Sequence, residues 1–320
     1  MWHVAGRVGI AVALLLATSY LLQMDDSLAR PARAVQAATV ATVQVDPILT
    51  VRAGSGDREY FISRHSIVPF GSQALGLPIL MYHYVRPLPS IQTDYLGYRL
   101  SVAPGDFEAQ MDLLHAQGYH PVNFNQVRDY FAERTALPSK PVVITLDDGY
   151  RDLYTAAYPV LRAHGFTAVA YIVPNFVGQP AYVTQSQILE MDREGIEIAS
   201  HTMSHPNLAR MSYGAAMNEL SKSKQWLEQL VGHPVLDFAY PSGQFTQQTV
   251  VAVQQAGYGT AVTEQISSPH TMADRYRWGR VRVGGGESLQ DFAAGLGPVM
   301  ASVTISNVEV EPVKYPPAPG

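Results

Sequence analysis

Short apolar runs alternate with stretches of helical periodicity from residue 77 to residue 296, and this alternation constrains the fold more than any other feature. We expect buried strands at residues 78–82, 119–122, 142–146, 167–173, 196–200, 236–240, 259–262 and 281–283. We expect helices at residues 106–117, 125–131, 153–164, 186–194, 213–231, 247–255 and 288–296. Such alternation implies parallel strands joined by right-handed crossovers. The pattern alone allows either a (β/α) barrel or an open doubly wound sheet.

Two adjacent carboxylates, Asp147 and Asp148, end the apolar run VVITL, and Gly149 follows them. Like charges at the end of a buried strand repel each other and are costly to desolvate. A metal ion would offset that cost, with one carboxylate as its ligand and the other as a base. Asp-Asp-Gly is also ordinary turn chemistry after a strand, so the motif alone leaves both interpretations open.

A second polar motif, HTMSHP, follows the predicted strand at residues 196–200. Its histidines, His201 and His205, are four residues apart, a spacing that places both on one face of a helical turn. Pro206 prevents regular continuation of that turn. An isolated pair of this spacing is often a surface coincidence, but its combination with the paired carboxylates indicates a metal site. One carboxylate and two imidazoles leave open coordination positions, as catalytic zinc-type sites do.

Together, TLDDGY and HTMSHP resemble the polysaccharide deacetylases, the carbohydrate esterase family 4 or NodB-homology enzymes, over residues 75–298. The resemblance implies a distorted (β/α) barrel, seven-stranded, rather than an open sheet. It implies that Asp147 is the general base and that Asp148, His201 and His205 bind one divalent metal ion. Zinc is the expected ion, and cobalt or nickel would also suit these ligands. The implied reaction is metal-assisted removal of an acetyl group from an N-acetylated sugar.

The segment FAYPSG, residues 238–243, ends another predicted strand at the place where the family has an arginine-bearing Pro-Tyr-Gly motif. This comparison implies that Tyr240 and Pro241 wall the sugar site, with Ser242 and Gly243 beside them. The backbone N–H of Ser242 would then face the developing oxyanion. A plain Pro-Gly turn is the alternative interpretation.

The arginine that orients the catalytic aspartate in the family is missing from this segment, where Phe238 and Ala239 stand. Arg280 and Arg282, in the run WGRVRV, can supply that charge from a neighbouring strand. We group Arg280 with the substrate-binding residues. A surface ion pair is the alternative role for both arginines.

Family members commonly carry a late Leu-x-x-His motif whose histidine is the general acid, but residues 288–296 contain no histidine. His83 instead ends the predicted strand PILMY. The run LMYH resembles the opening strand of exported poly-N-acetylglucosamine deacetylases, which look like circular permutants of the family with the acid histidine moved to the front. We therefore expect His83 to protonate the departing amine, a task that suits histidine at neutral pH. A satisfied core histidine is the alternative.

The N-terminal segment, residues 1–37, predicts export. His3 and Arg7 precede an apolar run at residues 8–22, and the small-residue sequences ARA and VQA follow it. The run is shorter than the roughly 20 residues of a spanning helix, so we expect a signal peptide, with an uncleaved membrane anchor as the alternative. We expect residues 38–74 to be a linker or small β-element and residues 299–320 to be a tail with a proline-rich, disordered end.

Composition narrows the class of partner. The absence of cysteine excludes thiolate sites and suits an exported chain, and the net charge of −5 gives no basic footprint for nucleic acid. We therefore expect an extracytoplasmic enzyme, secreted or tethered to the membrane, that removes N-acetyl groups from an N-acetylhexosamine polysaccharide. Peptidoglycan, poly-N-acetylglucosamine and chitin-like polymers are not distinguished by these residues, and neither is the oligomeric state.

Two alternatives to N-deacetylation stay open. The same site would also serve an O-acetyl glycan esterase. A catalytically inactive glycan-binding domain of the same fold is the other alternative, which the missing arginine favours and the complete set of Asp and His residues opposes.

Overall fold

The computed structural model describes residues 67–68 and 74–297, with side chains from residue 74 onward. The predicted signal peptide or anchor, the predicted tail and most of the segment 38–74 lie outside the described residues. Within that segment, β1 (Ile67–Val68) pairs antiparallel with β6 (Leu137–Pro138). Across the ranges described, no helix has the length and apolar character needed to cross a membrane. The domain boundaries given above stay predictions.

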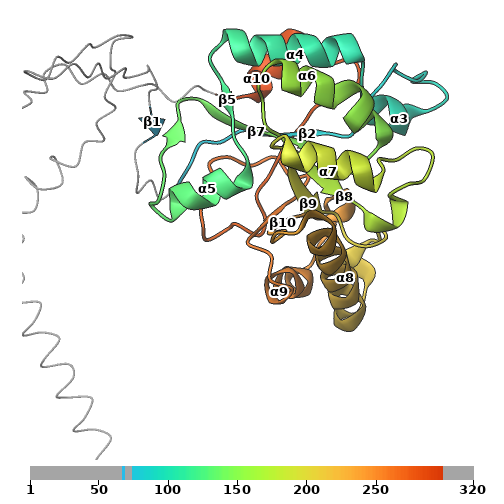
Figure 1. Cartoon of the computed structure of the whole chain (residues 1–320). Helices are drawn as coiled ribbons and strands as arrows, with labels where there is room; N and C mark the ends of the chain where they lie inside the picture. The colour runs from blue at the N-terminus through green and yellow to red at the C-terminus, as the bar shows by residue number, and fades with distance from the viewer. Residues whose placement is uncertain (1–66, 69–73, 298–320) are drawn as a thin grey trace, which may run out of the picture. The chain divides into compact units, whose positions relative to one another are not determined.

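One sheet of eight strands organises the described part of the chain (Figure 1). Seven strands follow one another in the order β11-β10-β9-β8-β7-β2-β12, and β5 pairs with the N-terminal part of β7. The bounds are β2 Ile79–Tyr82, β5 His120–Pro121, β7 Pro141–Leu146, β8 Val169–Ile172, β9 Glu197–Ser200, β10 Asp237–Ala239, β11 Thr260–Val262 and β12 Val281–Arg282. Every pairing within this sheet is parallel, as the alternation of elements predicts.

The two ends of this sheet are joined through the residues that precede β12. The Trp278 N–H donates to Ala261 O at 3.1 Å and the Thr263 N–H donates to Trp278 O at 2.8 Å, so this segment runs beside β11. A few residues later Val281 pairs with Leu80 of β2. The sheet is therefore curled into a distorted (β/α) barrel, and the predicted fold class is confirmed. β2 lies between β7 and β12; that this order is a circular permutation of the family arrangement stays a prediction.

Helices cover the outside of the curled sheet (Figure 1). α10 packs on α4, α4 on α6, α7 on α8, and α8 on α9. Their bounds are α3 Tyr95–Leu100, α4 Pro104–Ala116, α5 Phe124–Phe131, α6 Tyr158–Ala163, α7 Gln185–Arg193, α8 Tyr213–Val231, α9 Gln247–Gln255 and α10 Leu289–Gly295. The helix predicted at residues 153–164 is divided, because a π-helical turn, η1 (Leu153–Ala157), precedes α6.

Residues 84–102 form elements that the sequence pattern did not predict. β3 (Tyr84–Val85) pairs in parallel with β4 (Ser101–Val102), and α3 lies between them. The strands are only two residues long, too short to show a period. This excursion lies directly after His83, so it belongs to the loops around the C-terminal ends of the strands.

Capping residues fix the helix ends that the sequence located well. The Ser212 side chain accepts a hydrogen bond from the Ala215 N–H at the start of α8, and Gly232, with φ of 82°, ends it. Ala216, Leu220 and Leu227 form the buried face between these ends. Reciprocal capping boxes begin α5, α7, α9 and α10.

Alternate residues of each central strand supply two cores. In β7, Val143 faces the cluster inside the curl with Tyr171 and Trp278, whereas Ile144 faces the cluster between sheet and helices with Phe107. All residues of β7 are buried, which explains why its sequence is nearly continuous in apolar side chains. The strand that leads to the paired carboxylates is thus buried along its whole length and is paired on both sides, with β2 and with β8.

A buried charge cluster lies at the N-terminal end of the sheet, away from those carboxylates. Glu197 and Asp237 begin β9 and β10, and both pair with Arg128 of α5. The Phe124 N–H also donates to Glu197 Oε2 at 2.7 Å. Burial, together with the neighbouring Asp237 charge, raises the pKa of the Glu197 carboxyl well above its ordinary value.

Candidate active site

Strand ends bring the predicted catalytic residues to one edge of the sheet. His83 follows β2, Asp147 and Asp148 follow β7, and His201 follows β9. Parallel strands present their C-terminal ends at the same edge, which is where barrel enzymes carry their chemistry. All four side chains are buried, with exposed fractions between 2% and 8%.

Asp148, His201 and His205 form a compact group of oxygen and nitrogen donors. The Nε2 atoms of His201 and His205 lie 3.4 Å and 3.3 Å from Asp148 Oδ1. One donor atom from each residue lies within 4.8 Å of the other two. Three donors that share a tetrahedral ion at about 2.1 Å lie about 3.4 Å apart. The spacing of this group therefore fits a divalent metal ion.

The hydrogen bond of His201 also suits a metal ligand. Its Nδ1 lies 2.8 Å from the carbonyl oxygen of Ala239. A carbonyl only accepts, so Nδ1 carries the proton and the Nε2 lone pair faces Asp148.

The two histidines converge through an irregular loop, so the predicted helical turn is wrong. Residues 201–205 lie outside every helix, and Thr202 and His205 have φ values of 65° and 58°. The His205 N–H donates to Thr202 Oγ1 at 3.0 Å and closes the loop. Asp148 also has a positive φ, 70°. Backbone strain of this kind is concentrated at functional sites.

Arg280 supplies the positive charge beside Asp147. Its Nη1 and Nη2 atoms lie 2.7 Å from the two carboxylate oxygens, Oδ1 and Oδ2. Nη1 also donates to Thr145 Oγ1 at 3.0 Å, and Nε donates to Thr263 O at 3.0 Å. Arg280 is 1% exposed, which contradicts a surface ion pair. The grouping of Arg280 with sugar-binding residues does not match this geometry either, because its guanidinium is engaged within the protein.

Arg282, two residues further along the chain, behaves differently. It pairs with Glu264, and both side chains are about a quarter exposed. The surface-type ion pair therefore describes Arg282 but not Arg280.

The electrostatics of Asp147 and His83 follow from these contacts. Burial works to raise the pKa of the Asp147 carboxyl, but the charge and hydrogen bonds of Arg280 outweigh it and hold that pKa well below its ordinary value. Burial lowers the pKa of His83, and the Asp147 charge offsets this only in part. The His83 Nε2 lies 3.8 Å from Asp147 Oδ2, longer than a hydrogen bond. Its buried Nδ1 has no hydrogen-bond partner in the described part of the chain, which does not match a satisfied core histidine.

The segment at residues 240–243 differs from the predicted sugar wall. Tyr240 is fully buried, and its hydroxyl donates to Tyr276 O at 3.0 Å. Pro241 is buried at the start of the 3-10 turn η4 (Pro241–Gly243). Ser242 is exposed, with φ of 52°. The turn interpretation therefore describes this segment, while the oxyanion role of the Ser242 N–H stays a prediction.

Aromatic residues that the sequence reasoning missed lie next to the Asp-Asp-Gly turn. Tyr84 directly follows His83, and its ring stacks on Tyr150 with 3.7 Å between centroids. Tyr182 also stacks on Tyr150, at 5.2 Å, and Phe176 is tilted against Tyr182 at 4.7 Å. Tyr84 and Tyr150 had a signal in the sequence, since Tyr84 directly follows His83 and Tyr150 directly follows the Asp-Asp-Gly motif.

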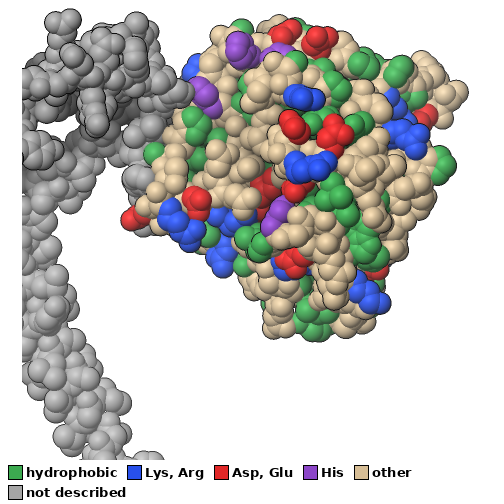
Figure 2. Space-filling model, viewed as in Figure 1, with side chains coloured by type: hydrophobic (Ala, Val, Ile, Leu, Met, Phe, Trp, Pro, Cys, Tyr) green, Lys and Arg blue, Asp and Glu red, His purple; other side chains and the backbone are tan. Residues whose placement is uncertain are grey.

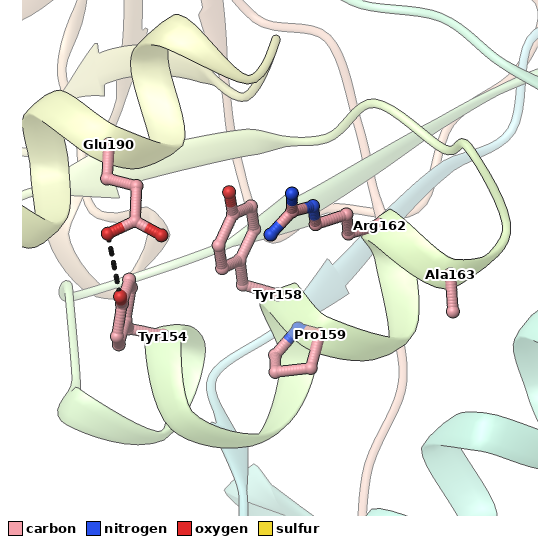
Figure 3. Close-up of a pocket in the computed structure, with 6 residues that line it drawn as sticks. All are labelled: Tyr154, Tyr158, Pro159, Arg162, Ala163 and Glu190. Carbon is pink, nitrogen blue, oxygen red and sulfur yellow. Dashed lines mark hydrogen bonds between the residues drawn. The ribbon is translucent and has the colours of Figure 1, made fainter.

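A cavity of about 550 Å³ lies between α6 and α7 (Figure 3). Its lining comprises Tyr154, Tyr158, Pro159, Arg162, Ala163 and Glu190, none of which belongs to the group described above. In Figure 3 the Tyr154 hydroxyl points to Glu190, to which it donates at 2.8 Å. The face in Figure 2 carries acidic and basic side chains side by side, in keeping with the small net charge.

Comparisons with known proteins identify relatives. The family model for polysaccharide deacetylase matches residues 134–261. YxkH of Bacillus subtilis (strain 168), a protein assigned to the polysaccharide deacetylases, is 32% identical over 218 residues, covering 68% of this chain and 75% of YxkH. A poly-beta-1,6-N-acetyl-D-glucosamine N-deacetylase of Staphylococcus aureus (strain MRSA252) is 24% identical over 189 residues, covering 53% of this chain. The match spans 64% of that protein, less than two thirds of its length.

Solved structures with the same fold include two deacetylase-related proteins. The Streptococcus pyogenes deacetylase PplD, solved with acetate, has a TM-score of 0.65 and 25% identity, covering 70% of this chain and 100% of PplD. IcaB from Ammonifex degensii has a TM-score of 0.62 and 26% identity, covering 71% of this chain and 99% of IcaB. The curled sheet and its acidic and imidazole groups define a barrel of the carbohydrate esterase family 4 type. The chain belongs to the polysaccharide deacetylases, a family of hydrolases.

Proposed function

We propose that the protein is a metal-dependent N-deacetylase that acts on an N-acetylhexosamine polysaccharide. The observation that carries this proposal is the placement of Asp147, held by Arg280, directly beside the Asp148–His201–His205 group. That placement puts a fixed carboxylate next to three donors suited to one divalent ion, with zinc the first candidate. The relatives named for poly-beta-1,6-N-acetyl-D-glucosamine support the substrate class.

The side chains divide the reaction between them. A bound divalent ion would supply Lewis acidity at the amide carbonyl. Asp147 accepts a proton from the attacking water. A carboxylate with a depressed pKa is a weak base, so the contribution of Arg280 is to keep Asp147 ionised and fixed in direction rather than to strengthen it. His83, on the neighbouring strand end, donates a proton to the departing amine; its lowered pKa makes the protonated imidazole a smaller fraction of the enzyme at neutral pH but a stronger acid.

The geometry weakens one alternative and leaves the other to experiment. The missing family arginine favoured an inactive glycan-binding domain, but the buried Arg280 contributes a guanidinium to Asp147 and removes that argument. An O-acetyl esterase would use the same groups, except that an alcohol leaves more readily than an amine and needs less help from His83.

Acetate release from matched N-acetylated and O-acetylated oligosaccharides tests the proposal. We expect release from the N-acetylated substrates, loss of nearly all turnover in Asp147→Asn, and retention of metal in that variant. Release from the O-acetylated series alone would establish the esterase instead. Absence of release from both series, in protein that contains metal, would establish an inactive domain.

We also propose that the protein acts outside the cytoplasm, on the strength of the apolar run at residues 8–22. Intact mass and N-terminal sequencing of the protein recovered from cell fractions test this. Cleavage near residue 37 supports secretion, an intact N-terminus in the membrane fraction supports an anchor, and recovery from the cytoplasm contradicts both.

A further inference from the structure

Four aromatic rings form a continuous stack beside the candidate metal ligands, and we call it the tyrosine ladder. Its members are Tyr84, Tyr150, Tyr182 and Phe176, in that spatial order. The rings of Tyr84 and Tyr150 are inclined by 21°, and those of Tyr150 and Tyr182 by 24°, so the three tyrosines are nearly parallel. The Arg86 guanidinium lies 3.5 Å above the Tyr84 ring and covers that end of the ladder.

The ladder is assembled from three different segments of the chain at the C-terminal edge of the sheet. Tyr84 follows β2, Tyr150 follows β7, and the other two residues belong to the segment between β8 and α7. Backbone hydrogen bonds tie that segment to the Asp-Asp-Gly turn: the Val183 N–H donates to Gly149 O at 3.0 Å and the Arg151 N–H donates to Ala181 O at 2.8 Å. The position of the ladder relative to Asp148 is therefore fixed.

The ladder is not part of either core. Tyr82 and Tyr171, which are core tyrosines, are fully buried, whereas all four ladder residues are partly exposed. A phenol hydroxyl both donates and accepts hydrogen bonds, so the three ladder tyrosines offer polar groups at their ring edges.

Partly exposed rings with phenol hydroxyls match the chemistry of a pyranose. Neighbouring rings and Arg86 occupy faces of the stacked tyrosines, so a sugar would meet their exposed edges. Its C–H groups can contact those edges, and its hydroxyls can exchange hydrogen bonds with the phenols. A single acetylated sugar over the metal ligands would leave much of a four-ring stack without a contact. A neighbouring sugar of the same polysaccharide chain would contact the remaining rings.

We propose that the tyrosine ladder binds the sugar units adjacent to the acetylated unit and thereby selects polymers over short substrates. The proposal rests on the proposed N-deacetylase function, because it takes the ligand to be an N-acetylhexosamine chain. The ladder residues are then binding residues, separate from those that carry out the reaction.

Binding to the metal-loaded Asp147→Asn variant separates affinity from turnover. Titration calorimetry with N-acetylglucosamine oligomers, from the monosaccharide to the pentasaccharide, in β-1,4-linked and β-1,6-linked series, should show affinity that rises with length. Adding Tyr182→Ala should weaken binding of the longest oligomer in the better series roughly tenfold and leave the monosaccharide nearly unchanged, since truncating a central aromatic contact typically costs a factor of this order. Tyr182→Phe, which keeps the ring, should lose much less.

Tyr154→Ala is the matched control. Tyr154 is also partly exposed and also stacks on a tyrosine, Tyr158, at 5.6 Å, but it lies on the outer face between α6 and α7. It should leave binding of every oligomer unchanged. An equal loss in the Tyr154 and Tyr182 variants, or affinity independent of length in both series, would overturn the proposal.

The same set of proteins distinguishes failure of this inference from failure of the proposed function. Length-dependent binding that Tyr182→Ala removes, without acetate release from the parent protein, keeps the ladder as a glycan site and rejects the deacetylase. Acetate release with binding that Tyr182→Ala does not alter rejects the ladder alone. A loss of metal or a fall in melting temperature in Tyr182→Ala, with weakened binding of the monosaccharide as well, would assign the ladder a structural role and overturn the proposal.

Discussion

Replacing Arg280 with methionine tests how the candidate base is held. The substitution keeps an unbranched side chain of similar length but leaves the Asp147 carboxylate without its buried partner. Removing one member of a buried ion pair costs about 3–5 kcal/mol, because the remaining charge is left desolvated and uncompensated. The Arg280 side chain is fully buried and bonds both carboxylate oxygens, so we expect a value within this range.

A double-mutant cycle isolates the interaction. Asp147→Asn leaves the guanidinium with only its bonds to Thr145 and Thr263, and we expect it to cost about 3 kcal/mol at neutral pH. The double variant, Asp147→Asn with Arg280→Met, buries no unpaired charge. We therefore expect it to be more stable than the sum of the single effects predicts, by about 3 kcal/mol.

Urea denaturation of the four chelator-treated proteins measures these differences without the influence of a metal ion. Arg282→Met is the matched control, because Arg282 lies two residues away but its pair with Glu264 is partly exposed. We expect it to cost no more than about 1 kcal/mol. Single effects that add, with a coupling free energy below about 0.5 kcal/mol, would refute the assignment of Arg280 as the partner that fixes Asp147.

Further tests address metal, acid and pH. His201→Ala should abolish both bound metal and activity with the fold retained, and Asp148→Asn should lower metal affinity; full metal content in either variant by elemental analysis contradicts the ligand set. His83→Ala should keep metal and fold, but its rate of amide hydrolysis should fall by orders of magnitude. Its rate with esters of good leaving groups should fall much less, and equal losses of rate on both substrates would indicate a structural histidine. Because the folded-state pKa of Glu197 is raised, its contribution to stability is fully present below the ordinary glutamate pKa and is lost as pH rises through the folded-state value. Glu197→Gln should remove that part of the pH dependence in urea denaturation, and an unchanged profile would contradict the raised pKa.

Local motifs in the sequence were enough to locate the candidate metal group. Asp148, His201 and His205 each stand at or just after a strand end, and parallel strands bring their C-terminal ends together whatever the details of the loops. The buried strands were predictable for a different reason, because short apolar runs mark them in the sequence. The turn that joins the two histidines was predicted wrongly as helical, because spacing alone does not reveal the positive φ values of Thr202 and His205.

Residues that depend on loop conformation were harder to predict. Tyr240 stands at a strand end like the others, yet its ring turns into a cluster with Phe238 and Phe245. Tyr182 lies in an irregular segment whose only link to the site is backbone hydrogen bonding to the Asp-Asp-Gly turn. Neither outcome is contained in hydrophobic periodicity, which reports burial along regular elements and not the path of a loop.

The partner of Asp147 depends on the order of strands around the barrel. β2 pairs with β7 on one side and with β12 on the other, so three consecutive strands place His83, Asp147 and Arg280 in one region. Arg280 precedes β12, in the segment that runs from beside β11 to beside β2. Its side chain reaches the Asp147 carboxylate from that segment. A second arginine two residues later has the same charge and nearly the same sequence context, but it pairs with Glu264 nearer the surface. The sequence alone therefore leaves Arg280 and Arg282 as equal candidates for the partner of Asp147. Only the closure of the sheet shows that Arg280 is that partner.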